Sequence, residues 1–471
     1  MASTRPRTRG TTIRLVERSG DLERYRSRSL WLDEYPGSLE PRPSLDGDLD
    51  CDIAIIGAGF TGLWTAYYLK REAPDARIVV LEKEIAGFGP SGRNGGWVQG
   101  GMAGTPSAYG LKGNRRLLDW AGAAADSSVE EIRSVVDREG IDCDFLEAGA
   151  LSLATSEPQR QRQLAEIGSG EQLLSPAQTA ELVRASGVCA SYFNPTAARV
   201  DPARLVRGLA EAVERSGVSI FERTAAIETG PGVVRCTSGS VKAETVIRAT
   251  EAFTTQAKDH ARQFLPLYSL MVATEPLPDS TWDEIGWEDG LLISDHHHLF
   301  FYAQRTRGGR LAIGGRGSPY RIQAPIDDQN ERNASVRSRL EETIARTFPL
   351  LADAEVTHHW GGPLAVPRDW SMSITFDPAS GTGWAGGYTG HGVAASNLSG
   401  RTLTDLVLGR QTELTEMPWV GHKVRNWEPE PLRFLASRAI IAMLERADRH
   451  EDRTGRKAGS VRLLKPFLAE K

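Results

Sequence analysis

Short apolar runs alternate with amphipathic stretches from residue 52 onward. Asp52–Ile56 is rich in β-branched residues and ends at a glycine, which is typical of a buried strand. The following stretch, 63–71 (LWTAYYLKR), has helical character, and a second apolar run, Arg77–Leu81, comes after it. This order predicts a strand, a helix and a second strand.

Helix and strand patterns continue to alternate through the middle of the chain. Residues 114–140 and 157–186 indicate polar helices, with a helix start at Ser175-Pro176, and 204–217 is an amphipathic helix ending at glycine. Strand patterning returns before Thr250, and we expect it to complete the first sheet. The runs concerned are SIFE, AAIET, GVVRCTS and TVIRAT.

The later part of the chain predicts a second sheet. Residues 265–275, 298–304 and 310–314 are apolar runs typical of a separate, largely antiparallel sheet. Helices are expected at 328–347 and at Phe434–Arg449. The chain thus predicts two interleaved units, one α/β and one mostly antiparallel.

A glycine motif lies between the first predicted strand and helix. Gly57, Gly59 and Gly62 form GxGxxG, and Glu82 ends the next strand twenty residues after Gly62. The glycines allow a tight turn and a close backbone approach to a pyrophosphate, while the helix N-terminus favours anionic phosphates. A carboxylate at Glu82 can accept hydrogen bonds from a ribose diol. The spacing predicts a dinucleotide site.

Glycine density rises again in two further segments. Gly87–Gly104 contains SGRNGGW, and Gly381–Gly392 reads GTGWAGGYTGHG before a helix with small residues near its start. A linker can have such a composition, but the embedded Arg93, Asn94 and Trp97 favour a loop that approaches a ligand closely.

Composition narrows the class of protein. A chain of 471 residues is longer than one hydrophobic core usually supports, which favours two connected domains. The net charge of −5 argues against a general nucleic-acid-binding surface. No apolar run reaches the roughly 20 residues that a membrane-spanning helix needs. The basic, polar N-terminus lacks a hydrophobic segment, so we expect no secretory signal. Four widely spaced cysteines suit reduced thiols, and we expect a cytoplasmic protein.

Four segments resemble the D-amino-acid oxidase superfamily of flavoproteins. They are GAGFTG with Glu82, SGRNGG (Ser91–Gly96), NPTAARVDPARL (Asn194–Leu205) and GGYTGHGVAASNLSGRTLTDLVLG (Gly386–Gly409). Within the superfamily the chain most resembles gamma-glutamylputrescine oxidases and related bacterial amine or aminophosphonate oxidoreductases. The resemblance implies FAD rather than NAD, bound noncovalently because the C-terminal half contains no cysteine for a linkage.

The resemblance also implies a fold and a division of the chain. The fold class is α/β (α+β overall), with a glutathione-reductase-like Rossmann FAD domain and an interleaved substrate domain built on a mostly antiparallel sheet. A tail and lead-in, containing SLWLDEYP packed on the domain surface, precede both. The expected segments are 1–47 for the tail and lead-in; 48–108, 196–262 and 363–412 for the FAD domain; 109–195 and 263–362 for the substrate domain; and 413–471 for a C-terminal helical extension.

Cofactor contacts are expected on three loops and beside two strands. We assign the glycine turn and Glu82 to the ADP half, place Lys83 beside the ribose, and expect the SGRNGG loop to wrap the pyrophosphate and the flavin edge, with Arg93 offsetting phosphate charge. Ile227 and Thr250 could pair with adenine and pyrophosphate, or be plain sheet residues. The full set is Gly57, Gly59, Phe60, Thr61, Gly62, Glu82, Lys83, Ser91, Gly92, Arg93, Asn94, Gly95, Gly96, Ile227, Thr250, Gly387, Tyr388, Gly390, His391, Gly392 and Val393.

Substrate-side candidates are aromatic or basic. His391 could contact substrate or flavin, or only hold its loop, and the helix after it could stabilise negative charge on the reduced flavin. Tyr302 and Arg305 lie beside a predicted strand and could bind an acidic substrate group. Trp97, Gln99 and Trp360 could form pocket walls, since aromatic faces exclude water and attract cations. Core packing is the alternative for each aromatic residue.

Other chemistries find little support. His296, His297 and His298 are consecutive, so on a strand their side chains alternate between faces and do not converge on one zinc ion. His358-His359 fails in the same way, and we expect no metal. No G-x-S-x-G motif is present for a serine hydrolase.

The expected activity is oxidation of a carbon–nitrogen bond in a small amine or amino acid. A hydride passes to flavin N5, the imine hydrolyses to a carbonyl compound and ammonia or an amine, and O₂ or another acceptor reoxidises the flavin. A hydroxy-acid oxidase or dehydrogenase and a non-catalytic flavin-binding protein are the alternatives. The sequence carries no signal for an oligomeric state.

Overall fold

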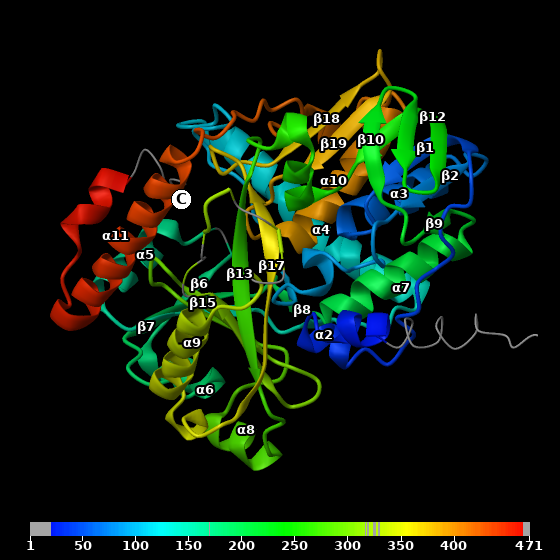
Figure 1. The fold of residues 1–471 in the computed structure, drawn as a ribbon. Coiled ribbons are helices and arrows are strands. Elements are labelled where there is room, and N and C mark those ends of the chain that lie inside the picture. The colour runs from blue at the N-terminus through cyan, green and yellow to red at the C-terminus, as the bar shows by residue number, and fades with distance from the viewer. Residues whose placement is uncertain are drawn as a thin grey trace, which may run out of the picture.

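The computed structural model describes residues 20–464, apart from 169, 316, 318, 319, 324, 325, 328 and 329. The expected tail, 1–19, lies outside the described residues. Two large sheets divide the molecule (Figure 1): one carries α3, α7 and α10, the other carries α6, α8 and α9, and the long strands β13 and β17 lie between these groups. This arrangement confirms the predicted α/β fold with an interleaved second sheet.

The first sheet has eight strands and a parallel centre. Its order is β10-β11-β12-β1-β2-β9, with β19 also paired to β12 and β18 to β19. The pairs β1–β12, β1–β2, β2–β9 and β12–β19 are parallel. The strands are β1 (Leu49–Ile56), β2 (Ile78–Leu81), β9 (Ser219–Phe221), β10 (Ala226–Gly230), β11 (Val233–Cys236), β12 (Gly239–Arg248), β18 (Ser373–Asp377) and β19 (Thr382–Gly386). The runs before Thr250 therefore complete the first sheet, as predicted.

The second sheet also has eight strands, ordered β17-β13-β16-β15-β14-β5-β7-β6. Its pairs are antiparallel except β14–β5. The strands are β5 (Ala150–Ala154), β6 (Gln172–Leu174), β7 (Ala190–Asn194), β13 (Leu265–Thr274), β14 (Leu292–Asp295), β15 (Phe301–Arg305), β16 (Leu311–Gly315) and β17 (Val356–Val366). A strand was expected to start at residue 298, but β15 starts at Phe301 because 298 and 299 contact α11 instead.

Four helices share the core of the first sheet, and close packing explains one glycine in them. They are α3 (Phe60–Glu72), α4 (Arg115–Glu139), α7 (Pro202–Arg215) and α10 (Gly392–Val407). A Cβ on Gly400 of α10 would lie 2.7 Å from Trp64 Cβ of α3, so only glycine lets these two helices approach this closely.

The segment 109–195, expected to belong to the substrate domain, is divided between the two sheets. Its helix α4 packs with α10 on the first sheet, while β5, β6 and β7 join the second sheet.

The remaining elements connect or cover the two sheets. A small third sheet joins β3 (Trp97–Val98), β8 (Ala198–Arg199) and β4 (Leu146–Glu147). The other helices are α2 (Leu30–Asp33), α5 (Glu157–Glu166), α6 (Pro176–Leu182), α8 (Asp279–Ile285), α9 (Ala334–Thr347) and α11 (Leu432–Thr454). The 3-10 turns are η1 (Pro90–Gly92), η2 (Glu251–Gln256), η3 (Lys258–His260), η4 (Pro349–Leu351), η5 (Glu413–Glu416) and η6 (Gly459–Leu464).

Two expectations about helices need correction. Residues 157–186 form α5 and α6 with β6 between them, and Ser175 caps α6 in a capping box. Of the helix expected at 328–347, residues 328 and 329 lie outside the described chain and α9 begins at Ala334. In SLWLDEYP, Leu30, Trp31 and Leu32 of α2 are buried against Ile85 and Ala203, while Asp33 and Glu34 are exposed. Among the described residues no helix has the length and apolarity to cross a membrane.

Candidate active site

The first loop, Gly57–Gly62, joins β1 to α3 at the centre of the parallel sheet. Gly57 has φ +105°, and a Cβ there would lie 2.6 Å from the Ala249 carbonyl oxygen. A Cβ on Gly62 would lie 2.0 Å from the Gly57 carbonyl oxygen. Both positions therefore require glycine, and the turn leaves the amide groups that begin α3 at the end of the sheet.

Glu82 lies against this loop. Its carboxylate accepts hydrogen bonds from Ala58 N at 2.8 Å and Glu84 N at 2.9 Å. Burial nevertheless raises the pKa of Glu82 to about 7, because desolvation outweighs the two amide donors. Lys83 beside it is exposed.

Ile227 lies on the segment that runs next to Glu82. Thr224 N donates to the Glu82 carbonyl oxygen at 2.7 Å, which places the start of β10 beside the end of β2. The β10–β11 register shifts between Ala226 and Glu228, and the Ile227 side chain is 70% exposed. An exposed aliphatic side chain beside the Glu82 carboxylate leaves apolar surface available to a planar base. Thr250 lies beside the glycine turn: a Cβ built on Gly57 would be 3.7 Å from Thr250 Cγ2.

The second loop, Ser91–Gly96, lies against the start of α3. Ser91 Oγ accepts a hydrogen bond from Phe60 N at 2.9 Å. Asn94 closes the loop on itself, since Nδ2 donates to the Ser91 carbonyl oxygen and Oδ1 accepts from Gly96 N, both at 2.9 Å. A Cβ on Gly59 would lie 2.9 Å from Ser91 Oγ, so the two glycine loops contact each other closely.

Arg93 links the second loop to distant parts of the chain. Its side chain is fully buried and forms an ion pair with Glu331 at 2.6 Å, while Nε donates to the Phe88 carbonyl oxygen at 2.7 Å. The guanidinium also lies 4.9 Å from the centre of the Phe88 ring. Glu331 also pairs with Arg28 at 2.9 Å, and Arg93 Nη2 is buried without a hydrogen-bond partner among the described residues. Arg93 fastens the second loop to the second sheet, where it also donates to the Gly361 carbonyl oxygen.

The third loop, Gly387–Gly392, precedes α10. A residue that the sequence analysis missed holds it: Glu251 Oε1 accepts from Gly387 N at 2.8 Å, and Oε2 accepts from Ala365 N at 2.9 Å. Burial raises the pKa of Glu251 to about 7. The Tyr388 hydroxyl lies 2.9 Å from Thr61 Oγ1 and so joins the third loop to the first. Glu251 follows the end of β12 by three residues, but no local pattern pairs it with residues 114 and 136 positions away.

His391 is the cap residue of α10 and is half-buried. Its amide donates to the Tyr388 carbonyl oxygen at 3.0 Å, and its carbonyl accepts from Ala395 N at 3.1 Å. Gly390 before it has φ +107° and no atom within 4 Å of a Cβ built there. Gly392 and Val393 form the first turn, where the amide groups of a helix lack partners within it.

Tyr302 of β15 faces the second loop. A Cβ on Gly95 would lie 2.6 Å from the Tyr302 ring, and Trp97 packs edge-to-face on that ring with a centroid distance of 6.4 Å. The hydroxyl lies 2.6 Å from Ser269 Oγ, and burial raises the pKa of Tyr302 to about 12. Gln304, two residues on and on the same face, donates from Nε2 to the Gly95 carbonyl oxygen at 2.5 Å.

Arg305 does not join this group, which corrects its pairing with Tyr302. Residues three apart on a strand point to opposite faces, and the Arg305 guanidinium lies 5.0 Å from the centre of the Trp282 ring of α8. It also forms an ion pair with Asp279 at 3.6 Å. Trp360 is buried and donates from Nε1 to the Arg93 carbonyl oxygen at 2.9 Å, so it supports the second loop. Gln99 is half-buried beyond β3.

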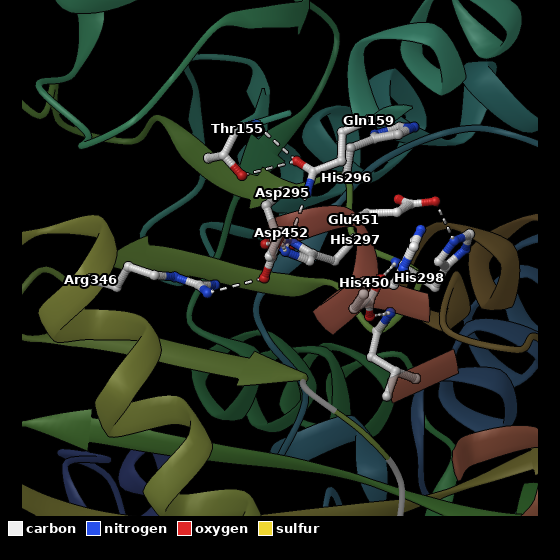
Figure 2. Close-up of polar contacts among 12 residues, drawn as sticks. Thr155, Gln159, Asp295, His296, His297, His298, Arg346, His450, Glu451 and Asp452 are labelled. Carbon is white, nitrogen blue, oxygen red and sulfur yellow. Dashed lines mark hydrogen bonds and ion pairs between the residues drawn. The ribbon is translucent and has the colours of Figure 1, made fainter. Parts of the chain in front are cut away.

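The three consecutive histidines contact acidic residues of two helices, α11 and α5, rather than one another. His297 is buried, with Nδ1 2.6 Å from Asp295 and Nε2 2.8 Å from Asp452 of α11 (Figure 2). His298 lies 3.6 Å from Glu451, also on α11, whereas His296 lies 3.2 Å from Glu166 of α5. Within the described part of the chain no group of three or more ligand-type residues could hold a metal ion. The cluster therefore anchors α11 to the second sheet.

Comparison with known proteins agrees with this geometry. Residues 52–406 match the model of the DAO family, described as FAD dependent oxidoreductase. The chain belongs to this family. The resemblance to the D-amino-acid oxidase superfamily is thereby confirmed, and the chain is an FAD-dependent oxidoreductase.

Similar proteins include named bacterial oxidoreductases. The chain is 28% identical to "Probable oxidoreductase OrdL" of Rhizobium meliloti over 81% of this chain and 89% of that protein. It is 27% identical to the "Gamma-glutamylputrescine oxidoreductase" of Escherichia coli over 78% of this chain and 86% of that protein. Glycine oxidase from Geobacillus kaustophilus has a similar fold, with a TM-score of 0.63 and 22% identity over 77% of this chain and 96% of that protein.

The site residues of this family member fit FAD. The glycines of the first loop leave a cradle that a Cβ would fill, the amides that begin α3 can donate to anionic phosphates, and Glu82 can accept from ribose hydroxyls. Exposed Ile227 suits the adenine, and the second and third loops meet the first through Ser91 and Tyr388. The chain's three loops converge on one place although they are far apart in the sequence.

Proposed function

We propose that this FAD-dependent oxidoreductase oxidises a carbon–nitrogen bond in a small amine or amino acid. Bound FAD supplies the hydride acceptor, at flavin N5. The substrate becomes an imine, which water hydrolyses to a carbonyl compound and ammonia or an amine. O₂ or another acceptor takes the electrons afterwards.

The observation that carries the proposal is the aromatic pair Trp97 and Tyr302 against the backbone of the second loop. Tyr302 contacts Gly95 and Trp97, and the Tyr302 hydroxyl has a partner in Ser269. Such a wall excludes water and presents ring faces that attract an ammonium group. The names of the relatives also support an amine substrate, because the Escherichia coli protein is a gamma-glutamylputrescine oxidoreductase and other relatives are sarcosine oxidase subunits.

The wall also favours the protonation state that the reaction needs. Oxidation requires a free electron pair on nitrogen, hence a neutral amine. Desolvation beside Trp97 and Tyr302 lowers the pKa of an ammonium group and so favours loss of its proton. Because burial raises the pKa of Tyr302 to about 12, its hydroxyl stays neutral and acts as a hydrogen-bond group rather than as an anion.

His391 and the start of α10 contribute on the side of the cofactor, by stabilising negative charge. The first amides of a helix carry partial positive charge, which stabilises negative charge that develops beside them. His391 caps that helix, and its backbone fixes the turn before it. We propose that His391 orients the third loop and the substrate side of the site together.

Anaerobic titration of the purified holoenzyme tests the proposal. The panel is a set of putrescine derivatives, N-methyl amino acids, D-amino acids and aminoethylphosphonate, with the corresponding alcohols and hydroxy acids as controls. We expect at least one amine to bleach the flavin absorption, with one carbonyl and one ammonia or amine formed per flavin. Bleaching by a hydroxy acid without nitrogen release would support the alternative hydroxy-acid activity and overturn the proposal, as would no bleaching by any amine.

Two tyrosine variants, compared by their rates of flavin reduction, test the role of Tyr302 in the substrate wall. Tyr302→Phe keeps the ring against Gly95 but removes the hydroxyl that contacts Ser269, and we expect flavin reduction to slow about fivefold to tenfold, the worth of one hydrogen bond. Tyr67→Phe on α3 loses its contact with Glu139 but lies outside the proposed substrate wall, so its reduction rate should stay at the wild-type value. Equal rates in both variants would remove Tyr302 from the site.

A further inference from the structure

The turn that contains the three histidines, residues 296–298, joins β14 to β15 and contacts α11. His297 is its most buried member, with a side chain only 3% exposed (Figure 2). Its Nδ1 lies 2.6 Å from Asp295 Oδ2, and its Nε2 lies 2.8 Å from Asp452 Oδ1. Asp295 ends β14 and Asp452 belongs to α11, so one imidazole ring connects the second sheet to this helix.

A second group competes for the same ring nitrogen. Gln159 of α5 is fully buried, and its Nε2 lies 3.2 Å from His297 Nε2. Thr155 sets the orientation of this amide, because its backbone N and its Oγ1 donate to Gln159 Oε1 at 2.8 Å and 3.2 Å. Gln159 therefore presents N–H groups to the ring, whereas Asp452 presents a carboxylate oxygen.

His297 Nε2 cannot serve both neighbours in the same protonation state. A carboxylate only accepts, so the Asp452 contact needs a proton on Nε2, whereas the Gln159 amide can donate only to an Nε2 without one. The charged ring therefore donates to both Asp295 and Asp452. After loss of the Nε2 proton, the ring still donates to Asp295 from Nδ1, accepts from Gln159, and presents a lone pair to Asp452. The protonation state thus selects α11 or α5 as the partner of the ring.

The direction of the pH dependence follows from these contacts. An unperturbed histidine has a pKa of about 6.5, so this side chain changes its charge within the physiological range. The charged ring has two carboxylate partners in the folded protein. Its contribution to α11 docking is therefore present at low pH and is lost as pH rises and Nε2 gives up its proton.

Other ion pairs also hold α11 and keep it attached in either state of the ring. Asp452 pairs through Oδ2 with Arg346 of α9 at 3.3 Å. Glu451 pairs with Arg162 of α5 at 2.8 Å and lies 3.6 Å from His298. Loss of the ring contact should therefore weaken the docking of α11 without removing it.

Two further histidines lie in the same region. His296 Nε2 lies 3.2 Å from Glu166 of α5, and His296 Nδ1 lies 3.1 Å from Ser152 Oγ of β5. His450 belongs to α11 and is half-buried (Figure 2). Because several histidines surround the helix, a pH effect on α11 has to be assigned to His297 by substitution.

The turn also leads to the proposed substrate wall. Asp295 Oδ1 accepts from Phe301 N at 3.0 Å, so the carboxylate that faces the ring also holds the first residue of β15. Asp448 of α11 accepts from the amides of residues 298 and 299, at 2.8 Å and 3.0 Å. Tyr302 follows Phe301 directly, so a change in the docking of α11 reaches the substrate wall through this turn.

We propose that His297 is a pH-sensitive switch for α11. The charged ring docks the helix through Asp452, and the neutral ring accepts from Gln159 instead and loosens the helix. Alkaline pH thereby loosens both α11 and the turn that leads to Tyr302. The switch is independent of which compound the enzyme oxidises.

Hydrogen–deuterium exchange of the holoenzyme at pH 6, 7, 8 and 9, read by mass spectrometry, measures the docking of α11. Each observed rate is divided by the intrinsic rate at that pH, so that only the protection of the amides remains. Peptides of α4 are the internal reference. We expect the protection of α11 to fall about tenfold from pH 6 to pH 9, the effect of losing one hydrogen bond to a charged group, and that of α4 to stay constant.

Substitutions assign the effect to one ring. Asp452→Asn keeps a partner for the ring at every pH, because an amide accepts from the charged ring and donates to the neutral one, so its α11 protection should not change with pH. His298→Gln and His450→Gln are the matched controls on the same turn and helix, and they should keep the wild-type fall. If thermal melting shows that Asp452→Asn does not fold, His297→Gln decides, since it cannot titrate and should also give a constant protection.

Equal protection of α11 at pH 6 and pH 9 in the wild type would overturn the proposal. A tenfold fall that persists in Asp452→Asn or His297→Gln would do the same, as would loss of the fall in His298→Gln or His450→Gln. An equal fall in α4 would show loosening of the whole molecule and would also overturn it. Because the exchange of α11 is measured, the result stands even if no amine reduces the flavin.

Discussion

The pH dependence of FAD affinity follows from the environment of Glu82. Burial holds the pKa of this carboxyl at about 7 in the protein without its cofactor, and Ala58 N and Glu84 N are its hydrogen-bond donors. A ribose diol donates to the ionised carboxylate, so FAD binding favours loss of the proton. Affinity should therefore rise as pH rises through about 7 and level off above it.

The size of the effect comes from the ionised fraction. At pH 6, one unit below a pKa of about 7, only about a tenth of the Glu82 carboxyls are ionised, so the apparent Kd should be about tenfold above its plateau. At pH 8 about nine-tenths are ionised, and the apparent Kd should be within about 10% of the plateau. The affinity gained between pH 6 and pH 8 is therefore about tenfold.

Titration of the apoprotein with FAD at pH 6, 7 and 8, followed by flavin fluorescence, measures this directly. Glu82→Gln is the matched variant: it cannot ionise, so its affinity should be weaker and nearly independent of pH. The comparison is needed because Glu251 also has a pKa of about 7 and holds the third loop. Equal Kd values at pH 6 and pH 8 in the wild type, or the same slope in Glu82→Gln, would refute the reasoning.

Two further predictions concern the third loop and the C-terminal helix. His391→Ala should keep FAD, since the helix cap of α10 is made by backbone groups, but should slow flavin reduction; stopped-flow rates equal to wild type would make His391 a packing residue. Glu451→Gln should destabilise the fold by about 3 kcal/mol, because it leaves Arg162 without the charge partner that lies 2.8 Å away in a nearly buried site. Burial alone would raise the pKa of Glu451, but hydrogen bonds from His298 and Arg162 lower it to about 2. The contribution of Glu451 is therefore complete above about pH 4.3 and is lost as pH falls toward 2, which urea unfolding at pH 7 and pH 3 would measure.

Features that depend on a few neighbouring residues could be predicted from the sequence. The β1–α3 turn is one, since the steric demand at Gly57 and Gly62 comes largely from backbone only a few residues away, with Ala249 added by the parallel strand. The strand runs before Thr250 are another, because their alternation and length indicate strands, and the second sheet is expected only from residue 265 onward. The family resemblance then supplied the identity of the cofactor.

Features that depend on distant residues could not be predicted. The ion pair of Arg93 with Glu331 is one, since Glu331 is 238 residues away and no local pattern indicates it. Glu251 holds the third loop across 136 residues for the same reason. The start of β15 was placed too early because Asp448 of α11 binds the amides of His298 and Leu299, which a strand would otherwise use.

The absorption spectrum of the purified protein beside that of Gly59→Val tests the central claim that the three loops form one FAD site. A Cβ at residue 59 already lies 2.9 Å from Ser91 Oγ, so valine pushes the first and second loops apart and fills the space for the pyrophosphate. Wild-type protein should show the flavin bands, and Gly59→Val should be colourless with its far-UV circular dichroism largely kept. A full flavin content in Gly59→Val, or a wild type that cannot take up FAD, would contradict the account.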